Sequence, residues 1–403
     1  MANFELMRQL TITHSTKIVL LVLDGLGGLP MEPEGPTELE AARTPNMDRL
    51  ATEGALGRTI PVAQGIAPGS GPAHLALFGY DPVEYDIGRG VLEAFGIGVK
   101  MGERDVAARG NFCTVDLEGK IIDRRAGRIP TEKAAPLVQK LAAITLPDVE
   151  LEVRPVREYR FLVVLRGEDL EADIEETDPL REGVAPFPAV ARSAGSQRAA
   201  ELFNLWIDEA RRLLANEYPA NAVTLRGFSK DPHLPKYEDV YKLRAACVAV
   251  YPMYKGLASL VGMHVRKLDG ELPADEFAAV RDCWADYDFF FVHVKPTDSR
   301  GEDGDFDGKV KVIESVDTAL PELMGLRPDV LIITGDHSTP ARLRTHSWHP
   351  VPALLWAPAT VMPDSSTTFG ERECARGGLG TFAAADLMPL ALAHAGRLSR
   401  YGA

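Results

Sequence analysis

Three short apolar runs constrain the fold of this chain more than any other feature, because each of them leads into an acidic residue. The runs are Ile18–Leu23, Phe289–Val294 and Val330–Ile333, followed by Asp24, Asp298 and Asp336. Short runs rich in β-branched and aromatic residues are typical of buried parallel strands. Ligands of an open α/β sheet bind outside the carboxyl ends of its strands. We therefore expect three distant acids to meet at one sheet edge, where their simplest role is to bind a divalent metal.

The domain organisation follows from length and from a change of pattern along the chain. A chain of 403 residues is longer than one hydrophobic core usually supports, so two domains are expected. Residues 1–85 and 237–403 alternate between strand-like and helix-like segments, whereas residues 86–236 are rich in arginine, glutamate and short alternating stretches. This pattern predicts an α/β parallel-sheet domain, discontinuous in sequence, with a smaller α+β cap domain inserted into it.

Charge and cysteine content exclude several classes of protein. A formal net charge of −14 argues against nucleic-acid binding, which usually needs a basic face. It leaves open an anionic small molecule, because local arginines and metals can dominate the field. The four cysteines are widely spaced without a CxxC pair, which indicates free thiols in a reducing compartment.

The N-terminal segment lacks the apolar core of a signal peptide, so we expect a cytoplasmic protein without membrane contact. Whether the protein forms a homo-oligomer stays open.

The pair Asp336-His337 directly follows one of the apolar runs. Carboxylate oxygen and imidazole nitrogen can both bind one divalent cation. The alternative is a turn in which the aspartate caps the next helix. Asp24 at the end of another predicted strand favours the metal-ligand interpretation. His346 and His349 lie just before a further apolar segment, and either could complete a metal site, although an isolated histidine there is more often structural.

An acidic segment follows the second run. Asp298 and Glu302 are predicted to reach one metal from a loop. Asp303, Asp305 and Asp307 are predicted to be solvated acids at a helix N-terminus, where they suit the helix dipole. A calcium-binding EF-hand loop is rejected, because its closing glutamate is missing.

Ser70 stands between Gly69 and Gly71 at the entrance to a short apolar helix. The glycines expose the hydroxyl, and the free N–H groups of a helix start favour an anion. A serine in this position could act as a metal-activated nucleophile. The alternative is a helix cap in a flexible loop, and spacing alone favours that alternative.

A cluster of arginines provides a candidate anion site in the inserted domain. Arg124, Arg125 and Arg128 can offer planar forks to phosphate or carboxylate, or they can form a solvated basic hairpin. Lys255 lies near a predicted strand end and helix start, from which it could bring positive charge to the same crevice.

Taken together, these segments resemble the archaeal-type 2,3-bisphosphoglycerate-independent phosphoglycerate mutases of the alkaline phosphatase superfamily. The resemblance extends from about Lys17 to Ala403, and its order and spacing are more specific than any single motif. The matching segments are Val22–Gly27, Thr44–Asp48, Gly69–His74, Asp123–Arg128, Tyr251–Gly256, Thr297–Asp298, Gly335–His337, His346–Pro352 and Asp386–Leu390.

The resemblance implies an alkaline-phosphatase-like fold, two divalent metal ions per chain, and interconversion of 3-phosphoglycerate and 2-phosphoglycerate through a phosphoserine at Ser70. Lys255 would stabilise the transferring phosphoryl group. The substrate would be held by Arg124, Arg125 and Arg128. One metal would be bound by Asp24, Ser70, Asp336 and His337. The other would be bound by Asp298, Glu302 and His346.

Glu302 departs from the family pattern, which has histidine four residues after the aspartate. Glutamate can still bind a metal, and its hard oxygen favours Mn²⁺ or Mg²⁺ over softer ions. His349 or His293 are the alternatives for this ligand. Two other functions remain open at this point. One is a different metal-dependent phosphotransferase or phosphatase with the same metal core, and the other is a catalytically silent binding module.

Overall fold

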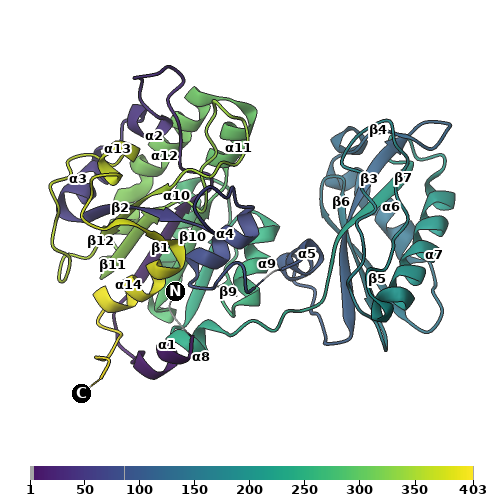
Figure 1. Ribbon diagram of the computed structural model, residues 1–403, viewed down its shortest axis with the longest axis horizontal. Helices are drawn as coiled ribbons and strands as arrows, with labels where there is room; N and C mark the ends of the chain where they lie inside the picture. Colours follow the sequence, from purple (N-terminus) through teal and green to yellow (C-terminus); the bar gives the residue numbers. More distant parts are fainter. Residues whose placement is uncertain (1–3, 86, 403) are drawn as a thin grey trace. The chain divides into compact units, whose positions relative to one another are not determined.

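The computed structural model describes residues 4–85 and 87–402, and the chain divides into two compact units (Figure 1). Unit 1 consists of Met1–Asp86 and Leu234–Ala403, and unit 2 of Ile87–His233. Residues 1–3, 86 and 403, at the ends of the predicted domain ranges, lie outside the described residues. Each unit has its own sheet and its own hydrophobic core.

Unit 1 is built on an eight-stranded sheet in the order β13-β2-β12-β11-β1-β10-β8-β9. Its strands are β1 (Ile18–Leu23), β2 (Ala55–Ile60), β8 (Ala245–Ala249), β9 (His264–Val265), β10 (Phe289–Val294), β11 (Val330–Thr334), β12 (Val351–Trp356) and β13 (Gly380–Ala383). The three apolar runs form neighbouring parallel strands, with β1 between β10 and β11. The predicted parallel sheet is confirmed for these strands, whereas β12 runs antiparallel to both of its neighbours.

Helices cover both faces of this sheet, which explains why the runs are apolar throughout rather than alternating. All six residues of β1 are buried. Alternate side chains of β1, such as Leu21, pack with Phe277 and Ile313 in the core on one face. The helices of unit 1 are α1 (Phe4–Leu10), α2 (Glu38–Ala41), α3 (Pro45–Glu53), α4 (Ser70–Leu77), α8 (Tyr237–Tyr241), α9 (Pro252–Leu260), α10 (Pro273–Asp282), α11 (Pro296–Asp303), α12 (Phe306–Met324), α13 (Glu371–Cys374) and α14 (Leu387–His394).

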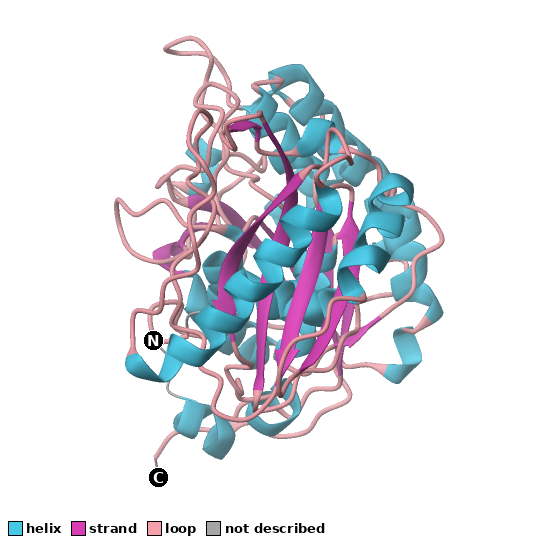
Figure 2. Ribbon diagram, turned by 90° about the vertical axis from the view of Figure 1, so that its right-hand side faces the viewer, coloured by secondary structure: helices cyan, strands magenta, loops and turns pink. Residues whose placement is uncertain are grey.

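Unit 2 contains a five-stranded antiparallel sheet in the order β4-β3-β6-β5, with β7 also paired to β3. Its elements are α5 (Arg89–Gly96), β3 (Asp105–Val115), β4 (Ile121–Asp123), α6 (Thr131–Ala142), β5 (Glu150–Arg157), β6 (Arg160–Arg166), α7 (Gln197–Leu214) and β7 (Ala222–Ser229). Phe161 of β6 packs against Trp206 of α7 in its core. Strands and helices can be followed by colour in Figure 2.

Candidate active site

The candidate site lies at the carboxyl ends of the three central strands of unit 1. Asp24 directly follows β1, and Asp336 and His337 follow β11. In the sheet register Leu23 pairs with Val294 and Val22 with Thr334, so the three strands end at the same edge. The fold therefore brings together acids that are far apart in the sequence.

Asp24, Asp336 and His337 form one group that could hold a metal ion, and all three are buried. His337 Nε2 lies 3.4 Å from Asp24 Oδ1 and 3.2 Å from Asp336 Oδ2. Ser70, the first residue of α4, places its Oγ 3.3 Å from the same nitrogen. The four residues that the sequence suggested for one metal are therefore neighbours.

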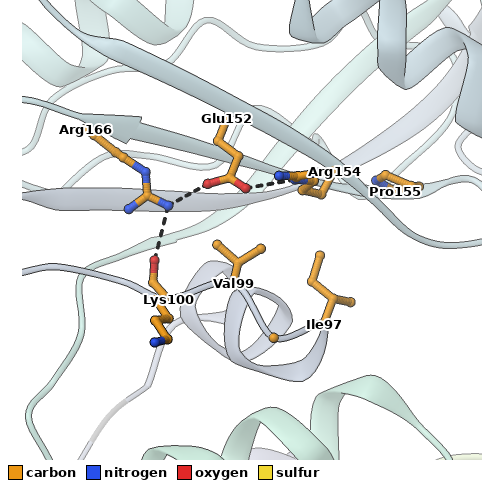
Figure 3. A pocket seen from close by; sticks show the side chains of 8 residues that line it. Ile97, Val99, Lys100, Glu152, Arg154, Pro155 and Arg166 are labelled. Carbon is orange, nitrogen blue, oxygen red and sulfur yellow. Dashed lines mark hydrogen bonds and ion pairs between the residues drawn. The ribbon is translucent and has the colours of Figure 1, made fainter.

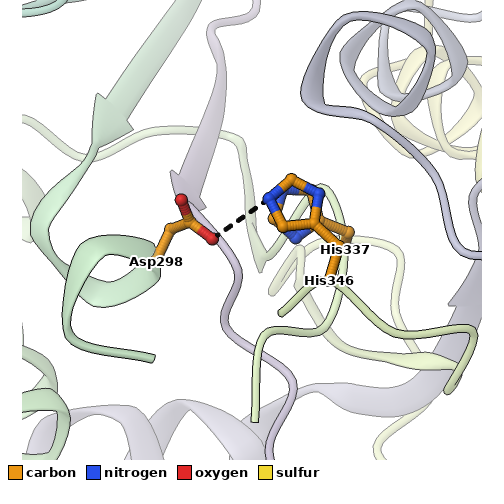
Figure 4. Close-up of side chains that lie close together, drawn as sticks. All are labelled: Asp298, His337 and His346. Carbon is orange, nitrogen blue, oxygen red and sulfur yellow. Dashed lines mark ion pairs between the residues drawn. The ribbon is translucent and has the colours of Figure 1, made fainter. Parts of the chain in front are cut away.

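Asp298, His337 and His346 form the second group (Figure 4). His346 Nε2 lies 3.5 Å from Asp298 Oδ1, while His346 Nδ1 is 2.9 Å from the Pro68 carbonyl oxygen. The rings of His337 and His346 stack with centroids 3.7 Å apart. His337 thus belongs to both groups, which the sequence did not indicate.

Asp298 and Glu302 do not lie on a loop, so that part of the prediction was wrong. Both are on α11, one turn apart and hence on the same helix face. Glu302 Oε1 is 3.8 Å from His346 Nε2, and its side chain is 54% exposed, so it borders the second group without joining it. The helix was recognisable from the sequence, because Pro296 stands in its first turn and Gly304 at its end.

The two alternative histidines lie elsewhere. His293 is buried 3.4 Å from Asp24 Oδ2 and stacks on Tyr254, so it borders the first group rather than the second. His349 places its Nδ1 3.0 Å from Ser347 Oγ and belongs to neither group.

Sequence analysis missed several residues that contact this site, among them Lys295 and Tyr254 beside Asp24 and His74 beside Asp336. The Lys295 ammonium lies 3.1 Å from Asp24 Oδ2 and also pairs with Asp298 Oδ2. The Tyr254 hydroxyl donates to Asp24 Oδ2, whereas its neighbour Lys255 lies half-buried on the same helix. Lys295 directly follows β10 and precedes Asp298 by three residues, a spacing that was visible in the sequence.

The charges of the site favour a cation. Burial alone would raise the pKa of Asp24, but Lys295 and the neighbouring histidines hold it well below its usual value. Burial lowers the pKa of His337 despite the two nearby carboxylates. At neutral pH the structure therefore presents ionised carboxylates and a neutral imidazole, the forms that bind metals.

The donor atoms also fit a divalent metal. Asp24 Oδ1 is buried and has no hydrogen-bond partner among the described residues, and Asp336 Oδ2 is buried with only the ring nitrogens of His74 and His337 beside it, each at 3.2 Å. Buried acceptors of this kind normally have a partner. Carboxylate oxygens combined with imidazole nitrogen suit a hard or borderline divalent cation.

In unit 2, the predicted arginines lie on a tight turn after β4. The Asp123 carboxylate accepts hydrogen bonds from the backbone N–H groups of Arg125 and Gly127 at 2.7 and 2.6 Å. Arg124 is held by Asp178 in a bidentate pair at 3.1 and 2.8 Å. Arg125 and Arg128 are exposed.

A second arginine cluster, which sequence analysis missed, lies on one face of the unit 2 sheet. Arg109 and Asn111 alternate along β3 with residues that face the α6–α7 core, so they point to the other face. In register, Arg109 lies opposite Arg226, and Asn111 lies between Arg160 and Thr224. We call Arg109, Asn111, Arg160, Thr224 and Arg226 the arginine face.

The arginine face contains polar atoms that lack partners. Arg109 is only 6% exposed, and its closest carboxylate contact is Glu93 at 3.9 Å. Its Nε, Asn111 Oδ1 and Thr224 Oγ1 are buried without hydrogen-bond partners among the described residues. Burial and the neighbouring arginines lower the pKa of Arg109 to about 10. An anion carrying a hydroxyl group would supply what these atoms lack.

Comparison with known proteins identifies the family. A family model described as 2,3-bisphosphoglycerate-independent phosphoglycerate mutase matches residues 51–221. A probable 2,3-bisphosphoglycerate-independent phosphoglycerate mutase of Thermus thermophilus is 54% identical over 404 residues, covering 99% of each chain. The counterpart of Thermotoga maritima is 52% identical over 402 residues, again covering 99% of each. The chain belongs to this family.

Solved structures agree with this assignment. The PH0037 protein of Pyrococcus horikoshii superposes with a TM-score of 0.84 at 30% identity, covering 97% of this chain and all (100%) of that one. The cofactor-independent phosphoglycerate mutase of Thermoplasma acidophilum gives a TM-score of 0.71 at 31% identity, with 94% and 100% covered. The family resemblance and the predicted α/β fold class are confirmed.

Two further observations concern alternative sites. A cavity of about 660 Å³ in unit 2 is lined by Lys100, Glu152, Arg154 and Arg166 (Figure 3). Glu152 already pairs with Arg154 at 2.8 Å and with Arg166 at 2.6 Å, and Arg166 also pairs with Asp105, so both arginines are already held by acids. Every helix within residues 4–85 and 87–402 is too short or too polar to cross a membrane.

Proposed function

We propose that this chain interconverts 3-phosphoglycerate and 2-phosphoglycerate without 2,3-bisphosphoglycerate, as an isomerase that passes through a phosphoserine at Ser70. One observation carries the proposal: the Ser70 hydroxyl lies 3.3 Å from Nε2 of His337, the residue that belongs to both groups of metal-ligand residues. Full-length identity of 54% to a probable mutase supports the choice of substrate. A glycolytic reaction of this kind would take place in the cytoplasm.

We further propose that the site holds two divalent ions, Mn²⁺ or Mg²⁺. Asp24, Asp336 and His337, with Ser70, would hold one ion, and Asp298, His346 and Glu302 the other. Glu302 would complete the second set after a small movement, since its oxygen is 3.8 Å from His346 Nε2 and its side chain is half exposed. When bound, such ions supply charge neutralisation and lower the pKa of a coordinated hydroxyl.

The chain's own residues would perform the remaining tasks. Ser70 begins α4, so N–H groups of the first helical turn are available to phosphoryl oxygens. Lys295, and Lys255 on α9, would neutralise negative charge on the transferring group. In the first step Ser70 gives up its hydroxyl proton, its Oγ–P bond forms, the substrate O–P bond breaks, and the released glycerate oxygen takes a proton. In the second step the other glycerate hydroxyl takes the phosphoryl group, and Ser70 regains a proton.

We propose that the arginine face binds the substrate, together with Arg125 and Arg128. Phosphoglycerate carries phosphate, carboxylate and a hydroxyl group. The buried Arg109 guanidinium suits either anion, and the unpartnered Asn111 Oδ1 suits the hydroxyl. The pairing of Arg124 with Asp178 supports a role for Arg124 in holding the turn that carries the other two arginines.

The test is mutase turnover by metal-stripped protein to which Mn²⁺ or Mg²⁺ is returned, without bisphosphoglycerate. Ser70→Ala should abolish turnover and phosphoserine formation, whereas Ser315→Ala, on the exposed side of α12, should change neither. Turnover by Ser70→Ala would refute the phosphoserine mechanism. Release of free phosphate in place of conversion would identify the chain as a phosphatase with the same metal core.

A further inference from the structure

The hydroxyl of Thr339 lies between the two groups of metal-ligand residues. Thr339 follows His337 by two residues and is fully buried. Its Oγ1 is 2.6 Å from Asp298 Oδ1 and 3.0 Å from His337 Nδ1. One hydroxyl therefore contacts both the aspartate of the second group and the histidine shared by the two groups.

Counting protons at this hydroxyl determines the direction of both hydrogen bonds. A carboxylate oxygen only accepts, so the Thr339 hydroxyl donates its single proton to Asp298. The hydroxyl can then only accept at His337, which requires a proton on His337 Nδ1. A histidine binds a metal ion as a neutral imidazole with one proton, so with that proton on Nδ1 it is Nε2 that can offer a lone pair to the ion. This nitrogen is the one that faces Asp24 and Asp336 at 3.4 and 3.2 Å.

The surroundings of Thr339 leave it little freedom. A Cβ on Gly25, which has φ +62°, would lie 2.5 Å from Thr339 Oγ1. A Cβ on Gly301 would lie 2.1 Å from the Thr339 carbonyl oxygen. That oxygen also accepts a 2.9 Å hydrogen bond from the buried Lys309 ammonium, which donates to the Gly25 and Gly27 carbonyls as well. The loop after β1, helix α11 and the end of β11 thus meet on this side chain.

We propose that Thr339 is a positioning residue that sets the tautomer of His337 and orients Asp298, so that both groups are arranged for metal binding before the ions arrive. This inference rests on the proposed metal-dependent function. Groups that hold a metal-binding histidine by its second nitrogen typically contribute about 10- to 100-fold to metal affinity. Thr339 acts on two ligands at once, so its loss should weaken binding at both groups.

The first test uses the unaltered protein. Nitrogen-15 NMR of the histidine side chains in metal-free, histidine-labelled protein reports which ring nitrogen carries the proton. We expect the Nδ1–H form at His337, assigned by its loss in His337→Gln. The Nε2–H form would overturn the proposal whether or not any variant folds.

The second test is Mn²⁺ titration by calorimetry, which needs no turnover. Thr339→Val keeps the shape and removes the hydroxyl, and we expect it to weaken Mn²⁺ binding about 10- to 100-fold. Thr339→Ser keeps the hydroxyl and should bind nearly as the wild type does. Thr334→Val is the matched control, because Thr334 is buried nearby and donates to the Pro352 carbonyl at 2.8 Å without touching a ligand residue.

The outcomes separate this inference from the proposed function. If Thr339→Val and Thr339→Ser lost Mn²⁺ affinity equally, the packing of the side chain would matter and its hydroxyl would not, which overturns the inference. Unchanged Mn²⁺ affinity of Thr339→Val would also overturn the inference. If the wild type binds Mn²⁺ with the expected tautomer but shows no mutase turnover, the proposed function fails and the role of Thr339 stands.

Discussion

Replacing Lys295 by methionine tests whether its ammonium is the counter-charge that stabilises the acidic site of the metal-free protein. Methionine preserves the length and the apolar part of the side chain. It leaves the Asp24 and Asp298 carboxylates without the cation that contacts both of them. We expect a loss of unfolding free energy in unit 1 that bound metal ions largely restore.

The magnitude follows from the distance and the burial. Opposite unit charges 3.1 Å apart, as for Lys295 Nζ and Asp24 Oδ2, interact by about 5 kcal/mol at an effective dielectric constant of about 20. Desolvation of the ammonium offsets part of this, and removing one partner of a buried pair costs about 3 to 5 kcal/mol. The Lys295 side chain is 23% exposed, so solvent screening places the expected loss at the lower end, about 3 kcal/mol.

The loss of unfolding free energy in Lys295→Met should be independent of pH across the neutral range. Burial alone would lower the pKa of Lys295, but the two carboxylates raise it above that of an ordinary lysine. Its contribution is therefore complete below about pH 10 and is lost only as the pH rises through the elevated value. The pKa of Asp24 is depressed, so its contribution is lost only in acid, as the pH falls below about 4.

Hydrogen exchange measured by mass spectrometry is the suitable assay, because it follows unit 1 separately from unit 2. In metal-free Lys295→Met, a loss of about 3 kcal/mol corresponds to about 100-fold faster exchange in peptides covering β1 and β10. With saturating Mn²⁺ the difference should shrink, because the ions replace the missing charge. Lys311→Met is the control, an exposed lysine on α12 that should change stability by no more than about 0.5 kcal/mol.

Two results would refute this reasoning. Unchanged exchange in metal-free Lys295→Met would show that the carboxylates do not need this counter-charge. An equal loss with and without Mn²⁺ would show that the ions do not bind beside Asp24 and Asp298.

Three further predictions concern other parts of the molecule. Glu302→His should retain turnover but shift the preference between Mn²⁺ and Mg²⁺ in activity titrations; an unchanged preference removes Glu302 from the ligands. Arg109→Gln should raise the KM for 3-phosphoglycerate about 10- to 100-fold, as expected for lost charged hydrogen bonds, whereas the exposed Arg104→Gln should leave it unchanged. Burial raises the pKa of Glu371 to about 7, so the wild type should lose unfolding free energy relative to Glu371→Gln as the pH rises from about 5 to 7. If the urea midpoints of the wild type and of Glu371→Gln changed in parallel between about pH 5 and 7, the last prediction would be contradicted.

The strand framework of unit 1 was predictable because its signal is local. A run such as Ile18–Leu23 is apolar at every position and rich in β-branched residues, which is typical of a strand covered on both faces. Parallel strands end at one edge, so the meeting of Asp24 and Asp336 followed from the pattern without knowledge of the packing. Helix α11 was also predictable from its proline and glycine, but its many acids and glycines favoured a loop interpretation.

The arginine face was not predictable, because strand pairing creates it. Arg109, Arg160 and Arg226 lie on three strands far apart in the sequence, and only the antiparallel register places them on one face. The sequence drew attention to Arg124, Arg125 and Arg128 because they are neighbours in the chain. In the structure Arg124 is committed to Asp178, a residue more than fifty positions away.

The sequence by itself determined the fold class, the family and the kind of chemistry, since apolar periodicity, glycine spacing and motif order are properties of short segments. Only the tertiary structure decided which atoms meet. Lys295 contacts two acids, and the Thr339 hydroxyl forms hydrogen bonds with Asp298 and His337. These contacts depend on distances of about 3 Å, which are set by packing among β1, α11 and β11. Hydrogen bonds weaken steeply beyond such distances, so no pattern along the chain specifies them.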